Sequence, residues 1–359
     1  MILHPPGIFI PYGMLVIVFA AALVHLIYGN KEWEEFSRQY SRIVWIILGA
    51  GIAAGDVWSY EVWEGYWIWD PAFTSILMSW LLFTAYLHST SMYRRGKMRL
   101  LTPALAVASF VFAMYSTYII RSGTIQSAHS FGEGIQTIPL LVFVVLLSTI
   151  SGGVIMYRYF TWKRDNEQKE SKLLSTINTF YATIILLALL SFILFWGLSS
   201  SMLLKYFGGT ISVDLYGSWS YPFSLALLAV LGICMFESLG KHWTKGIILG
   251  GVLIFIFLLA KPAANVYTNL SASVLSYAGI SSAYQILKSA NAKGIKNKLI
   301  SCGPHIVHLG VVVMLVGVLM STYATSETML FMKFNDTKTV GGYDVQLVDL
   351  AFPQKKDMI

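Results

Sequence analysis

Two long stretches without charge constrain this chain more than any other feature. Neither the stretch from Gly7 to Gly29 nor the stretch from Leu101 to Ile120 contains Asp, Glu, Lys or Arg. Each could cross a bilayer, whose hydrocarbon core needs roughly 20 apolar residues of helix. Charged residues make up 12% of the 359 residues, whereas a soluble domain carries roughly 25%. The sequence therefore predicts a multi-pass membrane protein.

The fold class predicted is an all-α integral membrane protein with about ten transmembrane helices and a short outer β element at the C-terminus. The second span is short and ends among tryptophans, and the ninth is the most polar, so a re-entrant segment is an alternative there. The predicted spans are residues 7–29, 43–57, 72–90, 101–120, 138–157, 176–204, 219–237, 246–260, 264–287 and 304–323.

The basic residues predict the orientation of these spans. Of the 25 Lys and Arg residues, 18 lie in alternate connecting loops, which are cytoplasmic by the positive-inside rule. Both termini are then extracytoplasmic in the cell membrane. The formal charge of +7 is interpreted as this topology signal, and nucleic acid is not expected as a partner.

The C-terminal segment differs in kind from the spans. Residues 1–323 form the predicted membrane domain, whereas residues 324–359 alternate polar and apolar side chains around a predicted turn at Gly341-Gly342. We expect this extracytoplasmic segment to form part of a small β element.

Residues 58–71, here called the Trp-rich segment, hold four of the eleven tryptophans and are predicted to be an outer loop: Trp58, Trp63, Trp67 and Trp69. One interpretation is a belt of aromatic rings at the lipid headgroups. The other is a platform for a large flat ligand, because stacked rings supply contact area at low entropic cost. Asp70 is either part of that platform or an N-cap for the next helix, with Pro71 at its first position.

The predicted topology sorts five histidines into two groups. His4 and His129 lie on the outer side with the Trp-rich segment, and His88 lies at the inner end of a span, as do His308 and, one turn away, His305. Histidines on different helices can supply both axial ligands of a haem iron. The alternative for each histidine is a packing role, and the choice between His305 and His308 is open.

These motifs resemble those of the System I cytochrome c haem lyases, the CcmF family, whose Trp-rich segment ends in Trp-Asp-Pro, as Trp69-Asp70-Pro71 does here. Four further stretches carry the resemblance: His4-Pro5-Pro6, His88-Ser89, Arg121-Ser-Gly-Thr with Ser127-Ala-His129-Ser-Phe, and His308-Leu-Gly with Tyr323. Members of the family usually have further spans before the His-Pro-Pro motif and a longer outer domain. The chain therefore resembles the C-terminal part of a divided lyase, which implies a second chain.

The resemblance implies an enzyme that attaches haem by thioether bonds to a Cys-x-x-Cys-His segment of apocytochrome c on the outer face. It implies a resident haem b on His88 and His308, whose iron those histidines ligate. The substrate haem would be ligated by His4 and His129, against Trp58, Trp63, Trp67, Trp69 and Asp70. Expected partners are apocytochrome c, a haem chaperone and thiol-reducing factors.

Two other functions remain open at this point. A haem transporter that delivers haem to a chaperone would need the Trp-rich segment and the outer histidines, but not the inner pair. A membrane haem b electron-transfer subunit would need the inner pair alone. A structural scaffold is the least specific alternative.

Overall fold

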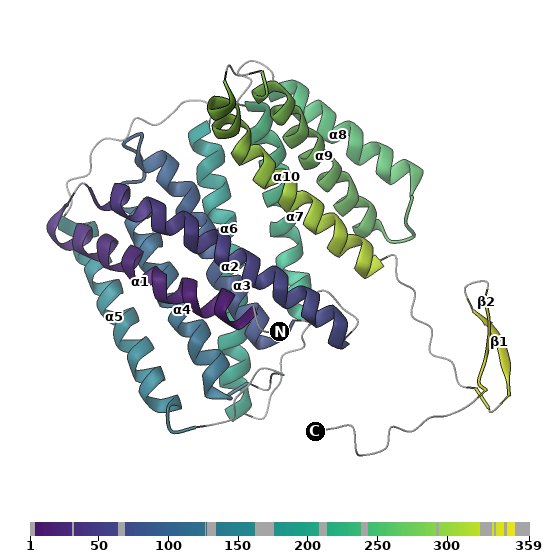
Figure 1. Cartoon of the computed structure of the whole chain (residues 1–359), viewed down its shortest axis with the longest axis horizontal. Coiled ribbons are helices and arrows are strands. Elements are labelled where there is room, and N and C mark those ends of the chain that lie inside the picture. The colour runs from purple at the N-terminus through teal and green to yellow at the C-terminus, as the bar shows by residue number, and fades with distance from the viewer. Residues whose placement is uncertain are drawn as a thin grey trace.

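The structure is a computed structural model that describes residues 4–30, 32–63, 69–125, 127, 134–161, 176–207, 214–237, 243–291, 294–323, 332–333, 335–340 and 343–348. These residues form ten helices and one two-stranded sheet (Figure 1). The helices are α1 (His4–Tyr28), α2 (Trp33–Trp63), α3 (Pro71–Tyr93), α4 (Leu101–Ser122), α5 (Thr137–Thr161), α6 (Thr176–Tyr206), α7 (Asp214–Glu237), α8 (Trp243–Ala260), α9 (Val266–Ser289) and α10 (Ile295–Tyr323). The strands are β1 (Thr337–Val340) and β2 (Tyr343–Gln346).

The helices confirm the predicted fold class. Within the described part of the chain, eight helices are long and apolar enough to cross a membrane. The other two are α8, whose apolar stretch Thr244–Ala260 is shorter, and α9, which is more polar. Each of the ten predicted spans corresponds to one helix, in the same order.

Helix α9 carries its polar side chains inward, which explains its weak signal in the sequence. Thr268, Asn269, Ser273, Ser282 and Gln285 are all buried. The helix is nonetheless continuous over 24 residues and is capped by the Asn265 side chain, which accepts a hydrogen bond from the Tyr267 amide at 2.8 Å. A single continuous helix of this length favours a span over a re-entrant segment.

The prediction for α2 was wrong at both ends. The helix begins at Trp33 rather than residue 43, and its first turns contain an ion pair between Glu34 and Arg38 at 2.7 Å. It also continues to Trp63. The first part of the Trp-rich segment is therefore helical and not loop, and residues 64–68 lie outside the described part of the structure.

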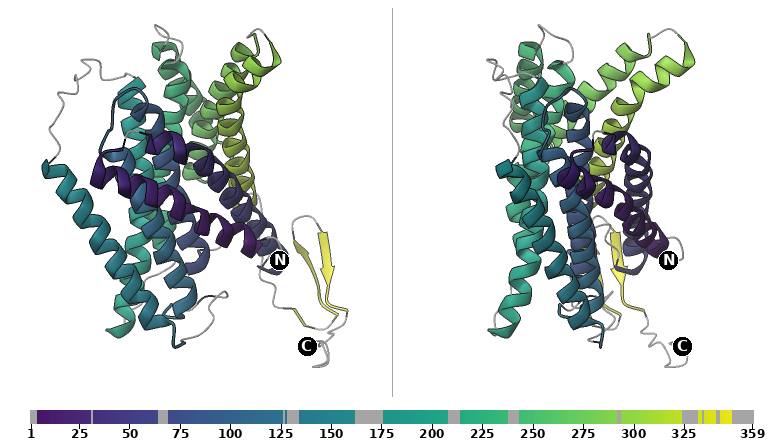
Figure 2. Two further views of the ribbon diagram at one scale, coloured as in Figure 1. Left: turned by 60° about the vertical axis from the view of Figure 1, so that its left-hand side comes forward. Right: turned by 90° about the vertical axis from the view of Figure 1, so that its left-hand side faces the viewer.

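Helices α1 and α2 pack against each other through glycine. A Cβ atom added to Gly51 would lie 2.7 Å from the backbone C and O atoms of Gly7, so the two backbones approach as closely as small residues allow. Figure 2 shows this pair inclined to the steeper helices α3–α6. The close crossing brings His4, at the start of α1, against α2.

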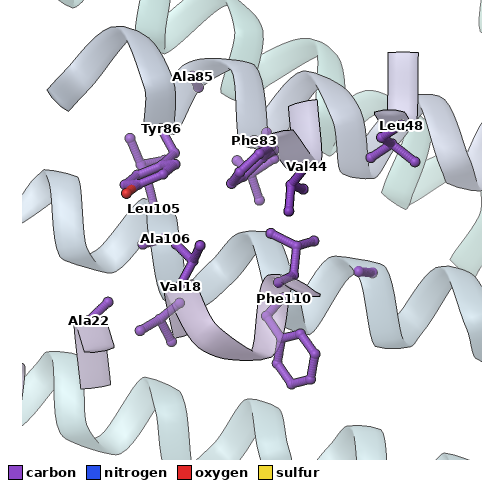
Figure 3. Packing of buried hydrophobic residues seen from close by; sticks show 14 of the residues in the cluster. Val18, Ala22, Val44, Leu48, Phe83, Ala85, Tyr86, Leu105, Ala106 and Phe110 are labelled. Atoms are coloured by element: carbon purple, nitrogen blue, oxygen red, sulfur yellow. The ribbon is translucent and has the colours of Figure 1, made fainter. Parts of the chain in front are cut away.

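The largest hydrophobic core joins α1–α4 and extends to α6. Figure 3 shows side chains from α1, α2, α3 and α4 meeting there, among them Val18, Val44, Phe83 and Phe110. Phe83 and Tyr86 of α3 are both fully buried, with ring centroids 5.4 Å apart. Helix α3 is thus fixed on one side by this core, and its other side is left to face α6, α7 and α10.

Strands β1 and β2 confirm the predicted β element. They are antiparallel, with Val340 opposite Tyr343, so residues 341–342 connect them. The predicted turn at Gly341-Gly342 itself lies outside the described residues. The residues of β2 are all exposed.

Candidate functional site

A cavity of about 660 Å³ lies where α3 and α6 meet α7 and α10. This volume is within the range of small-molecule and cofactor sites, roughly 300–1,000 Å³. Its wall is mostly aliphatic and aromatic, with a few polar groups. Its aromatic, polar and sulfur-containing lining residues include Trp45, Trp69, Trp80, Thr84, His88, Arg95, Phe180, Cys234, Met235, His305 and His308, and Pro304 lies beside them.

His88 of α3 and His308 of α10 face each other in this cavity. Their ring centroids are 6.1 Å apart and the ring planes cross at 67°. Phe180 of α6 lies next to them, with its ring centroid 6.2 Å from that of His88. The structure therefore brings together the two histidines that the sequence assigned to an inner pair.

Both rings are held in the same way by their own helices. The Nδ1 atom of His88 lies 2.8 Å from the carbonyl oxygen of Thr84, and Nδ1 of His308 lies 2.7 Å from that of Pro304. A carbonyl oxygen only accepts hydrogen bonds, so Nδ1 carries the proton in each ring. The lone pair is then on Nε2, which is how a metal-ligating histidine is usually prepared by its second hydrogen bond.

His305 also lines the cavity but is arranged differently. Its Nδ1 lies 3.3 Å from the Sδ atom of Met235 in α7, and no ring contact with His88 is found among the described residues. Geometry therefore favours His308 over His305 as the partner of His88.

His25, which belongs to neither histidine group, has a packing role. Its Nδ1 donates to the carbonyl oxygen of Asn30, and its Nε2 lies 3.4 Å from the hydroxyl oxygen of Tyr93. The ring also stacks on Trp33 at 5.3 Å. Both ring nitrogens have protein partners, so His25 does not resemble a ligand.

Asp70 caps α3, which was one of the two roles predicted for this residue. Its Oδ1 accepts hydrogen bonds from the Ala72 amide at 2.8 Å and from the Ser127 hydroxyl at 2.9 Å. The second bond ties the Trp-rich segment to the segment that contains His129. Trp69 stacks on Tyr216 of α7, with centroids 5.7 Å apart and planes at 17°, and also lines the cavity.

The outer site is only partly described. Trp58 lies in the last turns of α2, Trp63 ends that helix, and Trp67 and His129 lie outside the described residues. His4 is buried, with 8% of its surface exposed, and its Nδ1 donates to the carbonyl oxygen of Gly51 at 2.8 Å. An outer pair of His4 and His129 stays a prediction.

The sequence analysis did not identify Trp45, Trp80, Thr84 or Arg95 as residues of the cavity. Trp45 of α2 stacks on Trp80 of α3, with centroids 5.4 Å apart, and its Nε1 donates to the Thr84 hydroxyl at 2.9 Å. Arg95, just after α3, lines the same cavity. The helical spacing of residues 77, 81, 84 and 88 is a signal for this face of α3, but no comparable signal identifies the contribution of α2.

The chain is similar in sequence to proteins of cytochrome c assembly. Residues 1–126 match the family model described as cytochrome C assembly protein. The cytochrome c-type biogenesis protein CcmF of Pseudomonas aeruginosa is 26% identical over 96% of this chain and 55% of its own length. The CcmF of Haemophilus influenzae is 33% identical over 48% of this chain and 28% of its own length.

A solved structure of the cytochrome c haem lyase CcmF has the same fold. It superimposes with a TM-score of 0.71 at 20% identity, over 89% of this chain and 51% of that protein. Over most of its length the chain is similar to CcmF proteins in sequence and in fold.

The match to CcmF extends over nearly all of this chain but not over all of CcmF. The chain spans about half the length of the curated CcmF relatives that it matches along most of its length. The family model ends near His129, so it includes α1–α4 with His4, the Trp-rich segment and His88. The partner histidine His308 comes from α10, beyond that model.

Proposed function

We propose that this chain acts in cytochrome c biogenesis as the haem-attaching part of a lyase, with a resident haem b on His88 and His308. The observation that supports it best is the pair of facing imidazoles whose Nδ1 atoms both donate to carbonyl oxygens four residues earlier. The residues fit a haem because the donor set is two neutral imidazoles in a largely apolar cavity.

The resident haem would supply one-electron transfer when bound. The protein's part is to hold both imidazoles in one tautomer, with the lone pair on Nε2, and to keep water away with the apolar wall around Phe180 and Trp80. Met235 fixes the orientation of the His305 ring through the 3.3 Å contact with its Nδ1, whereas His308 is the histidine whose ring contacts His88.

The reaction proposed for the outer face is addition of the two apocytochrome thiols to the two haem vinyl groups. Each addition forms one C–S bond and one C–H bond from an S–H and a C=C bond, so no external oxidant is needed. The substrate haem would be held by His4 and His129 and lie against Trp58, Trp63, Trp67 and Trp69. Asp70 supports this site through its bonds to Ala72 and Ser127.

The orientation and partners belong to the same proposal. Both termini and residues 324–359 are placed on the extracytoplasmic side, by the positive-inside rule. The chain would receive haem from a haem chaperone, act on apocytochrome c kept reduced by thiol-reducing factors, and assemble with a second chain that supplies the N-terminal part of the lyase.

A complementation assay tests this function. A host that lacks the chain is given the wild type, His88→Ala or His129→Ala, and covalent haem in cytochrome c is measured by in-gel peroxidase activity. Loss of covalent haem in both variants supports the lyase. Normal maturation with His88→Ala would favour haem transport, and normal maturation with both variants would leave only an electron-transfer role.

A further inference from the structure

Arg95 lies at the end of the cavity nearest to the histidine pair. Helix α3 ends at Tyr93, five residues and roughly 7.5 Å beyond His88 at 1.5 Å per residue, and Arg95 follows in the next turn. The amino-terminal part of α10, with Pro304, His305 and His308, lines the same end. Arg95 is the one Lys, Arg, Asp or Glu residue lining this cavity in the part of the chain that the structure describes.

The neighbouring Arg94 has protein partners that Arg95 lacks in the described ranges. Arg94 lies 3.9 Å from the Glu34 carboxylate, and its Nε donates to the carbonyl oxygen of Thr90 at 3.4 Å. The guanidinium of Arg95 makes no hydrogen bond or ion pair with any residue in the described ranges. It is exposed at the cavity mouth and available to an anion.

The cavity is lined by apolar side chains, by imidazoles and by one guanidinium, and these follow one another along α3. Along α3 the lining residues run from Trp69 just before the helix, through Leu77 and Leu81, to His88 near its end and Arg95 after it. A haem has the matching order, with an apolar vinyl edge, a central iron and two propionate carboxylates on the opposite edge. A carboxylate at an apolar cavity mouth needs a cation or water, and a guanidinium binds carboxylates through two parallel hydrogen bonds.

We propose that Arg95 binds a propionate carboxylate of the haem held by His88 and His308, and so fixes the propionate edge at the cavity mouth beside α3. This rests on the proposed resident haem and adds the residue that decides which way the haem lies. The vinyl edge then faces Trp69 and Leu77, toward the Trp-rich segment. Arg94, already paired with Glu34, has no such role.

The test is haem binding to the full-length chain, purified in detergent from haem-deficient cells. Protohaem and its dimethyl ester, which lacks both carboxylate charges, are titrated into the wild type, Arg95→Gln, Arg95→Lys and Arg94→Gln. We expect the wild type to bind protohaem about tenfold more tightly than the ester, a difference of about 1.4 kcal/mol. Arg95→Gln should bind both equally, Arg95→Lys should keep part of the preference, and Arg94→Gln should behave as the wild type.

The midpoint potential of bound haem gives a second readout. Arg95→Gln should lower it, because removing a cation disfavours the reduced iron. An unchanged ester preference and potential in Arg95→Gln, with haem binding that still depends on His88, would overturn the role of Arg95 alone. Haem binding unaffected by His88→Ala would overturn the resident haem site and this inference together.

Discussion

The imidazoles of His88 and His308 lie 6.1 Å apart, although they come from the third and tenth helices of the chain. Each is fixed by a hydrogen bond to its own helix, so neither depends on the other for its orientation. Helix α3 is anchored by the large core on its opposite side. The pair is therefore preorganised, which lowers the cost of binding a ligand between the two helices.

The crossing of α1 and α2 predicts an unusual response to alanine. Gly51→Ala should destabilise the protein by about 1–3 kcal/mol, because the new Cβ would meet the Gly7 backbone at 2.7 Å. Gly13→Ala, where nothing lies within 4 Å, should be neutral or stabilising, because alanine favours helix. Thermal unfolding in detergent measures both. Equal melting temperatures for the two variants would show that the close crossing does not exist.

Asp70 is predicted to act as a hydrogen-bond acceptor rather than as a charge. Asp70→Ala should cost about 1 kcal/mol at the start of α3, through loss of the cap, and should lower cytochrome c maturation. Asp70→Asn keeps an acceptor oxygen and should mature cytochrome c nearly as the wild type does. Ser127→Ala removes the hydroxyl that donates to Asp70 but leaves the bond from the Ala72 amide, and should have a smaller effect. If Asp70→Asn failed as completely as Asp70→Ala, the carboxylate charge itself would be needed.

Thr84 contacts its neighbours through two groups, a hydroxyl bonded to Trp45 and Trp80 and a carbonyl oxygen bonded to His88, and a substitution can separate them. Thr84→Val removes the hydroxyl that Trp45 donates to but keeps the carbonyl oxygen that holds His88. We expect a loss of about 1 kcal/mol in stability and an unchanged haem spectrum. A spectrum altered as in a His88 variant would mean that the hydroxyl, and not the carbonyl, orients the imidazole.

Met235 is predicted to fix the orientation of the His305 ring, so that His305 does not replace His308 when His308 is removed. In a His308→Ala background, Met235→Leu removes the sulfur that lies 3.3 Å from His305 Nδ1. His305 is three residues from His308 on the same side of α10, so the double variant should regain part of the six-coordinate haem absorption. His305→Ala in addition should abolish that recovery. Recovery that survives this third change would come from another ligand.

The sequence predicted that His88 and His308 lie at the same end of their spans, but not which faces of the helices meet. Counting basic loops placed His88 and His308 at the same end of their spans, and the structure brings them together. Trp45 and Arg95 were missed because nothing local says which side of α2 or of the α3 turn meets a distant helix. That depends on how α7 and α10 pack, which is a property of the whole bundle.

The short span predicted for α2 and the weak signal of α9 have a common physical cause. Charged and hydroxyl side chains lowered the signal for a span in both helices. In the structure Glu34 is buried and paired with Arg38, and Ser37 and Ser41 donate to carbonyl oxygens of their own helix. In α9 the polar residues face inward. Polar residues that form hydrogen bonds or lie buried inside a helix bundle lower the hydropathy of the sequence, so the signal for a span is weaker than the structure warrants.

The most direct test of the central claim is the visible spectrum of the detergent-purified chain, oxidised and then reduced, for the wild type, His88→Ala, His308→Ala and His305→Ala. The account predicts a six-coordinate b-type haem in the wild type and in His305→Ala, and its loss in the other two variants. A wild type without haem, or a spectrum that survives both His88→Ala and His308→Ala, would contradict it.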